Sequence, residues 1–270
     1  MSGPTILVLL DSPDDGAACL RAGTDAAAAF EGARIEILRV SPDPDRLVRP
    51  PDVLTGRMAA AMRARAAGET TLLRAAFDAW RTARPTIEAV WIAVEGVPAA
   101  TVRERTALAA LLVMTRPSDA THPENVDAFD AGLFETGKPV LAVPPGPGAP
   151  FGRHLAVGWR DHRATRRSLA ALRPWLMAAA TVTLITVTDG EASLPAADWQ
   201  AANLPPGAVL RTIRPAGRPD GVALLQEAEA VGADGLAIGA YRRGRLLERL
   251  FGGVTADVLR QTPFPVLMRA

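Results

Sequence analysis

The sequence is poor in the residue types that usually reveal a chemistry. Its 270 residues include one cysteine, Cys19, so no disulfide can form within the chain, and we expect a reducing compartment. Cys19 falls in an alanine-rich stretch that is typical of a packed helix, where a small apolar side chain fits. The three histidines, His122, His154 and His162, show no helical ligand spacing and have no cysteine nearby. We therefore expect no metal site.

Charge and hydrophobic runs exclude further classes. The net charge is +1, which gives no electrostatic reason to expect nucleic acid or an acidic membrane as a partner. No apolar run approaches the roughly 20 residues that span a bilayer. The first residues show no basic start followed by a long apolar stretch, so we expect no signal peptide and a cytoplasmic protein. A nucleophile elbow, Gly-x-Ser-x-Gly, and a P-loop, Gly-x4-Gly-Lys-Ser/Thr, are both absent from the sequence.

A proline-rich segment divides the chain. Residues 144–150 contain four prolines, which cannot continue a helix or a central strand, and the segment is predicted to be a stiff, extended spacer. We expect a first domain over residues 1–143, a Pro/Gly linker over 144–153 and a second domain over 154–270.

Each half shows the same alternation of apolar strand-like runs and helical stretches. Alternating strands and helices predict a parallel sheet with helices on both faces, and strands that are apolar throughout fit a sheet covered on both sides. The fold class is therefore α/β, with two doubly wound five-stranded parallel sheets in tandem. The expected strands are Thr5–Leu10, Arg34–Val40, Ile87–Val94, Ala109–Thr115 and Pro139–Val143, then Leu155–Trp159, Thr181–Val187, Val209–Ile213, Leu236–Ile238 and Pro265–Met268. The expected helices are 13–30, 52–82, 124–134, 163–177, a short one near Trp199, 221–231 and 254–260.

The most informative segment lies near the C-terminus. A short apolar run ends at Gly239, a basic loop with Arg242, Arg243 and Gly244 follows, and Gly252-Gly253-Val254-Thr255 precedes a helical stretch. Glycines let a backbone approach phosphate oxygens, and a helix N-terminus presents free N–H groups and a positive dipole end. The segment resembles the C-terminal signature of the universal stress protein family, Gly-x2-Gly-x9-Gly-Ser/Thr, which wraps an ATP triphosphate.

The resemblance covers nearly the whole chain and is specific from Gly235 to the end. It implies a Rossmann-like, adenine-nucleotide-hydrolase-like fold duplicated in tandem. It also implies that the domains pair within one chain through their last strands, with a homodimer as a further arrangement. ATP or AMP would be the ligand, with Mg²⁺ bound only together with the nucleotide, and a protein of unknown identity would be the partner.

The signature is incomplete at the residues that touch phosphate. Gly239 and Gly252 fall on the first and third family glycines, whereas Arg242 stands at the second and Gly253 at the Ser/Thr position. Two interpretations of Arg242 remain open: its side chain fills the phosphate channel, or it reaches in and binds together with Arg243. Thr255 could supply the missing hydroxyl or be an ordinary first-turn helix residue.

The family aspartate that follows the first strand and contacts the nucleoside matches Asp11 in the first half and Arg160 in the second. Asp11 is also interpretable as a cap for the helix that follows it. Near the glycine loop the carboxylates are Glu248 and Asp257, and no residue type there indicates a catalytic base.

The sequence thus favours a non-catalytic stress-response regulator or scaffold with a degenerate nucleotide site in the second domain. An ATP or AMP sensor that binds phosphate through Arg242 and Arg243 is the alternative, and a slow nucleotide hydrolase is a third reading.

Overall fold

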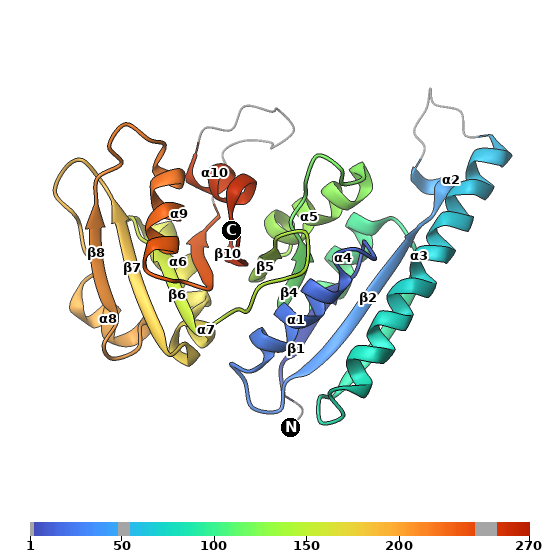
Figure 1. Cartoon of the computed structure of the whole chain (residues 1–270), viewed down its shortest axis with the longest axis horizontal. Coiled ribbons are helices and arrows are strands. Elements are labelled where there is room, and N and C mark those ends of the chain that lie inside the picture. The colour runs from blue at the N-terminus through green and yellow to red at the C-terminus, as the bar shows by residue number, and fades with distance from the viewer. Residues whose placement is uncertain (1–2, 48–54, 241–252) are drawn as a thin grey trace.

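The structure is a computed structural model that describes residues 3–47, 55–240 and 253–270. In this part of the chain a ten-stranded sheet runs through the whole molecule, with helices on both of its faces (Figure 1). The first half comprises β1 (Thr5–Leu9), α1 (Gly16–Ala27), β2 (Arg34–Pro42), α2 (Pro44–Leu47), α3 (Gly56–Thr82), β3 (Ala89–Gly96), α4 (Pro98–Thr106), β4 (Ala109–Thr115), α5 (Pro123–Glu135) and β5 (Val140–Val143). The second half comprises β6 (His154–Gly158), α6 (Arg163–Ala171), α7 (Arg173–Ala178), β7 (Thr181–Val187), α8 (Ala197–Asn203), β8 (Val209–Ile213), α9 (Asp220–Ala230), β9 (Gly235–Gly239), α10 (Val254–Gln261) and β10 (Val266–Arg269).

The strand order is β3-β2-β1-β4-β5-β10-β9-β6-β7-β8. Within each half all strands are parallel. Counted outward from the centre of the sheet, equivalent strands of the two halves follow in the same order: β5-β4-β1-β2-β3 on one side and β10-β9-β6-β7-β8 on the other. This confirms the predicted α/β class with two doubly wound five-stranded units. The structure adds that the two units form one continuous sheet.

The central pair of strands joins the halves. β5 and β10 are antiparallel, with Leu141 opposite Leu267 and Val140 opposite Met268. All four of these side chains are fully buried. These four side chains are apolar, and they point to both faces of the sheet. Strands whose side chains are apolar on both faces are typical of a sheet that is covered on both sides.

Two hydrophobic clusters lie on the two faces of the sheet, and each contains residues of both halves. Alternate residues of one strand enter different clusters: Ile6 and Val8 face α1 and α3, whereas Leu7 and Leu9 face α4 and α5. In the second half α6, α7 and α8 continue the first cluster, and α9 and α10 the second. The halves therefore share their core layers.

The predicted stiff, extended spacer lies against α1. The Gly146 N–H donates to Asp15 Oδ1 at 2.9 Å. At Gly148, whose φ of +80° suits glycine, an added Cβ would lie 2.9 Å from the backbone of Ala18. The division of the chain at residues 144–153 stays a prediction.

The helices differ from the prediction at α2 and α4, which were not predicted, and at α6 and α7, which were predicted as one helix. α4 was not predicted, because Pro98–Thr106 carries several charged residues and buries only three positions, one per helical turn. The predicted helix over 163–177 is two helices, because the chain breaks at Leu172 ahead of Pro174, which cannot donate to the preceding turn. Most other boundaries lie within a few residues of the predicted ones, and residues 52–54 of the predicted helix 52–82 fall outside the described part.

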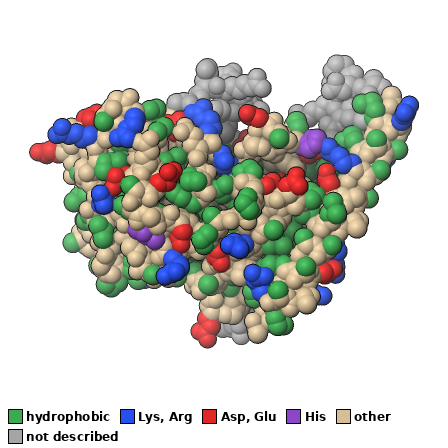
Figure 2. Space-filling view, in the orientation of Figure 1, with side chains coloured by type: hydrophobic (Ala, Val, Ile, Leu, Met, Phe, Trp, Pro, Cys, Tyr) green, Lys and Arg blue, Asp and Glu red, His purple; other side chains and the backbone are tan. Residues whose placement is uncertain are grey.

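The surface is electrostatically mixed. Acidic and basic side chains are interspersed over the face drawn in Figure 2. None of the helices in the described ranges has the length and apolar composition needed to cross a membrane.

The shared core leads to a first prediction. Leu141→Ala should lower the free energy of unfolding by about 2–5 kcal/mol, because it leaves a cavity at a fully buried seam position. Urea denaturation followed by circular dichroism and by tryptophan fluorescence should give one coincident transition for both halves. The matched control is Leu108→Ala, a leucine that is 90% exposed, with an expected change of about 0.5 kcal/mol or less. Two separate transitions, or equal effects of both substitutions, would refute a common core.

Candidate functional site

In open parallel sheets, ligands bind at the carboxyl ends of the strands where the strand order reverses. The order reverses between β1 and β4 in the first half and between β6 and β9 in the second. The candidate residues therefore follow Leu9 and Thr115 in one half, and Gly158 and Gly239 in the other.

In the second half, Gly239 is the buried last residue of β9, and Gly253 is the N-cap of α10. The Gly253 carbonyl accepts the N–H groups of Ala256 and Asp257 at 3.0 and 3.2 Å, which starts the helix. The predicted residues Arg242, Arg243, Gly244 and Gly252 lie outside the described residues. Gly239 and Gly253 are thus the two ends of the predicted loop that the structure describes.

Val254 and Thr255 form the first turn of α10, and both are partly buried. This turn packs tightly on α9: a Cβ added to Gly221 would lie 2.6 Å from Asp257 Cβ and 2.9 Å from the Val254 carbonyl oxygen. Glycine at position 221 is what allows this approach. The predicted phosphate-binding end of α10 therefore has a fixed position against α9.

The opposite edge of this region is formed by residues after β6. Arg160, which is largely exposed, pairs with Asp220 at the start of α9, Nη2 to Oδ2 at 3.0 Å. Asp161 accepts the Ser193 hydroxyl at 2.7 Å and pairs with Arg166 at 2.5 Å. The Ser193 hydrogen bond, followed by that from Arg166, lowers the pKa of the exposed Asp161 carboxyl.

Trp159 anchors the loop that carries Ser193. Its side chain is buried, its indole N–H donates to the Ser193 carbonyl at 2.8 Å, and its ring lies 4.8 Å from that of Trp199. Ser193 and Asp220 could not be predicted as site residues, because both lie in polar segments far along the chain, and no spacing marks them as neighbours of β6.

In the first half, Asp11 does not cap α1, contrary to the capping interpretation. The helix begins at Gly16, with Asp15 as N-cap. Asp11 instead has a buried carboxylate oxygen, Oδ1, without a hydrogen-bond partner in the described part of the chain. Burial raises the pKa of Asp11 to about 6, Asp15 adds to the rise, and the Thr115 hydroxyl and Arg39 oppose it.

Arg39 fills the space beside Asp11. It is 2% exposed, its Nη1 donates to the Asp11 carbonyl at 3.0 Å, and its Nη2 pairs with Glu69 of α3 at 2.7 Å. Its Nε donates to the Thr70 hydroxyl at 3.3 Å. Three partners on one guanidinium compensate its burial. A charged residue inside an apolar strand, such as Arg39, is a feature from which a buried ion pair could have been predicted.

The residue that follows β4, Arg116, is bonded to α10 of the other half. Arg116 Nη1 donates to the Leu259 carbonyl in α10, and the Arg116 N–H donates to the Val143 carbonyl at 2.7 Å. A cation near the last turn of a helix is favoured by the helix dipole. Loss of hydration lowers the pKa of Arg116, whose Nε is buried without a partner among the described atoms.

The remaining reactive side chains are packed away or scattered. Cys19 is fully buried and lies 3.3 Å from the Thr115 hydroxyl, and burial raises the pKa of its thiol. Within the described ranges, no group of three or more His, Cys, Asp or Glu side chains could hold a metal ion. Asp257 is paired with Arg260 at 2.6 Å. The described residues thus present a helix N-terminus framed by ion pairs.

Comparison with known proteins agrees with this geometry. Residues 160–269 match the model of the universal stress protein family. A universal stress protein from Archaeoglobus fulgidus DSM 4304 is similar in structure with a TM-score of 0.70, 14% sequence identity, and coverage of 98% of this chain and 96% of that chain. A functionally unknown protein from Pseudomonas aeruginosa PAO1 is similar with a TM-score of 0.60, 15% identity, and coverage of 98% and 92%. At such identities the similarity establishes a shared fold. No curated protein sequence matches the chain.

The resemblance carried by Gly239, Gly253 and the last strand is therefore confirmed by the family model, which spans all three. The structural similarity extends the same fold over the first half. The C-terminal half, residues 160–269, therefore carries a domain of the universal stress protein family, and the whole chain shares the fold of a solved universal stress protein.

Proposed function

We propose that this universal stress protein is a non-catalytic cytoplasmic regulator or scaffold of a stress response, with a degenerate nucleotide site in its C-terminal half. The proposal rests chiefly on the buried Arg39 guanidinium, which donates to the Asp11 carbonyl. Asp11 matches the aspartate with which the family contacts the nucleoside. A cytoplasmic location fits the single, buried cysteine.

The first half supports the proposal through the cost of opening its site. A ligand at Asp11 has to displace Arg39 from Glu69, Thr70 and the Asp11 carbonyl. Removing one partner from a buried charge typically costs about 3–5 kcal/mol. Adenine stacking and a few hydrogen bonds have to exceed that cost before any net affinity remains.

The second half supports the proposal through Arg160. Where the family has a carboxylate for the nucleoside, this chain has a cation that already pairs with Asp220. A guanidinium offers donors only, whereas a ribose hydroxyl donates most favourably to a carboxylate. The base and ribose of a nucleotide therefore have no carboxylate to bind in the second half, although this half keeps part of the glycine loop.

The ATP or AMP sensor remains the second candidate, because one observation favours it. Gly253 is the N-cap of α10, and the N–H groups of Val254 and Thr255 in the first turn have no carbonyl within the helix to bind. In this reading Arg242 and Arg243 supply the phosphate contacts that the family obtains from glycine, and Mg²⁺ accompanies the triphosphate.

A slow hydrolase has less support. Of the two carboxylates near the loop, Asp257 is buried and paired with Arg260, and Glu248 lies outside the described residues. Hydrolysis needs a positioned base or metal. We expect a protein partner instead, bound to a chain whose two domains already pair within one molecule.

Nucleotide titration tests the proposal. Isothermal titration of the full chain with Mg-ATP and with AMP should give no measurable heat of binding in the wild type, because Arg39 and Arg160 occupy the nucleoside positions. The double variant Arg160→Asp, Arg242→Gly restores both family residues and should gain affinity for ATP. Arg163→Asp, which changes charge on the neighbouring exposed position, is the control and should gain none.

Tight binding of ATP by the wild type, lost in Arg242→Ala, would replace the proposal by the sensor. ATP turnover above the blank would be required for the hydrolase. Thermal unfolding with and without ATP is an independent test. A ligand at 100 times its dissociation constant stabilises a protein by about 2.7 kcal/mol, so a sensor should unfold at a higher temperature with ATP and a scaffold should not.

Asp11 leads to a prediction about pH. Its pKa in the folded protein is about 6, against an ordinary 3.8, so the folded state binds the proton more tightly than the unfolded state does. The stabilising effect of the proton is complete below the ordinary value and is lost as the pH rises through about 6, a loss of about 3 kcal/mol at most. Asp11→Asn cannot ionise and should be more stable than the wild type at pH 7.5, with the difference shrinking towards pH 4.

Urea denaturation of both proteins at several pH values between 4 and 8 measures this difference. A stability difference that does not vary with pH would show that Asp11 ionises normally.

A further inference from the structure

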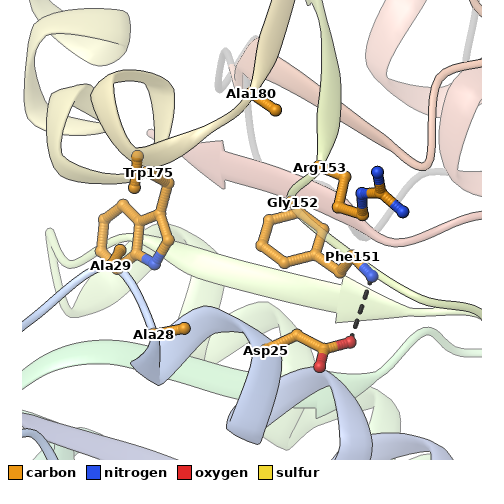
Figure 3. A pocket seen from close by; sticks show the side chains of 9 residues that line it. Asp25, Ala28, Ala29, Phe151, Gly152, Arg153, Trp175 and Ala180 are labelled. Carbon is orange, nitrogen blue, oxygen red and sulfur yellow. Dashed lines mark hydrogen bonds between the residues drawn. The ribbon is translucent and has the colours of Figure 1, made fainter.

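A cavity of about 320 Å³ lies where the two halves meet, at the amino ends of the strands and so at the sheet edge opposite the candidate nucleotide site. Its walls come from the end of α1, the residues that enter β6, and α7 with the residues after it (Figure 3). Ligand sites of this size are typically found at such junctions between domains.

Most of the wall is apolar and fixed in place. The Trp175 side chain is 4% exposed, its indole N–H donates to the Ala26 carbonyl at 3.0 Å, and Phe30 packs edge-on against it at 5.3 Å. Because the indole N–H is already bonded and the ring is almost fully buried, Trp175 can offer a ligand only the small exposed part of its ring. The other apolar lining residues are Ala28, Ala29, Phe151, Ala178 and Ala180.

One acidic side chain borders this apolar slot. Asp25 Oδ2 accepts the Phe151 N–H at 3.2 Å, and Figure 3 shows the carboxylate below the Phe151 ring. In the described part of the chain no donor is recorded for Asp25 Oδ1. Burial raises the pKa of Asp25, Arg21 and Arg84 oppose the rise, and Asp234 adds to it. A partly desolvated carboxylate with one uncommitted oxygen gains energy from a cationic donor.

One basic side chain, Arg153, also borders the slot, and Figure 3 shows it above the Phe151 ring. The backbone around Arg153 is held by Asp234, which accepts the N–H groups of Gly152, Arg153 and His154 at 3.0 Å each. The Arg153 guanidinium is exposed and points away from Trp175 in Figure 3. Among the described residues it makes no ion pair, with Asp25 or with any other carboxylate. Two opposite charges therefore flank one cavity without neutralising each other.

We propose that this cavity binds a free α-amino acid with an apolar side chain. The ammonium group donates to Asp25 Oδ1, the carboxylate accepts from the Arg153 guanidinium, and the side chain lies against the Trp175 and Phe151 rings. The ligand bridges α1 of the first half and α7 of the second, so its binding stabilises the junction between the halves. This site is independent of any nucleotide bound at the opposite edge.

Probes that differ by one charge test the proposal on the full chain. Isothermal titration with L-phenylalanine, L-leucine and L-isoleucine should show binding by at least one of them. Phenethylamine, which lacks the carboxylate, and 3-phenylpropionate, which lacks the ammonium, should each bind about tenfold or more weakly than phenylalanine, because each loses a charge-assisted hydrogen bond. Absence of binding by all three amino acids at about 10 mM, or equal affinity for phenylalanine and either single-charge probe, overturns the proposal.

Three variants locate the site. Asp25→Asn keeps an oxygen for the Phe151 N–H and removes the charge, Arg153→Gln removes the other charge, and Ala178→Leu fills the cavity from an exposed position. Each should weaken amino-acid binding about tenfold or more while the urea midpoint of the free protein stays close to that of the wild type. Asp189→Asn, an exposed carboxylate after β7, is the matched control and should bind as the wild type does. Unchanged affinity in all three variants also overturns the proposal.

Discussion

The structure depends on the antiparallel pairing of β5 with β10, centred on Leu141 and Leu267. It is the one antiparallel pair in the described sheet, and it converts two five-stranded units into one body with continuous cores on both faces. Arg116 and Arg269 reinforce it, because each donates to a backbone carbonyl of the other half, at Leu259 and at Gly137. A chain that pairs its two halves internally in this way has no unpaired central edge to protect.

Much of the fold could be predicted from local pattern. Apolar runs such as Thr5–Leu10 and Ala109–Thr115 correctly indicated strands, because parallel strands covered on both faces are apolar almost throughout. α4 escaped because a short helix with a polar majority has no periodic apolar stripe. The seam could not be derived from residues either, since antiparallel pairing of β5 with β10 depends on contacts 126 positions apart in sequence (141 against 267). It followed only from the family resemblance.

The site was less predictable, for a physical reason. The glycines and Asp11 were identified from their place after strands, but what surrounds them comes from distant elements: Glu69 from α3, Asp220 from α9, and Leu259 from α10. Each of these partners is an ordinary residue in its own segment. A charge in an apolar strand, as with Arg39, is the local signal that could have been used, because a buried guanidinium needs partners nearby.

The central claim is that the family's architecture is retained while the chain's own side chains occupy the nucleoside positions. Hydrogen–deuterium exchange of the full chain, with and without Mg-ATP, tests both parts at once. We expect the amides of β5 and β10 to be among the slowest to exchange, and residues 11–19 and 115–118 to exchange identically in both conditions. Protection of residues 11–19 by ATP, or rapid exchange in β5 and β10, would contradict the account.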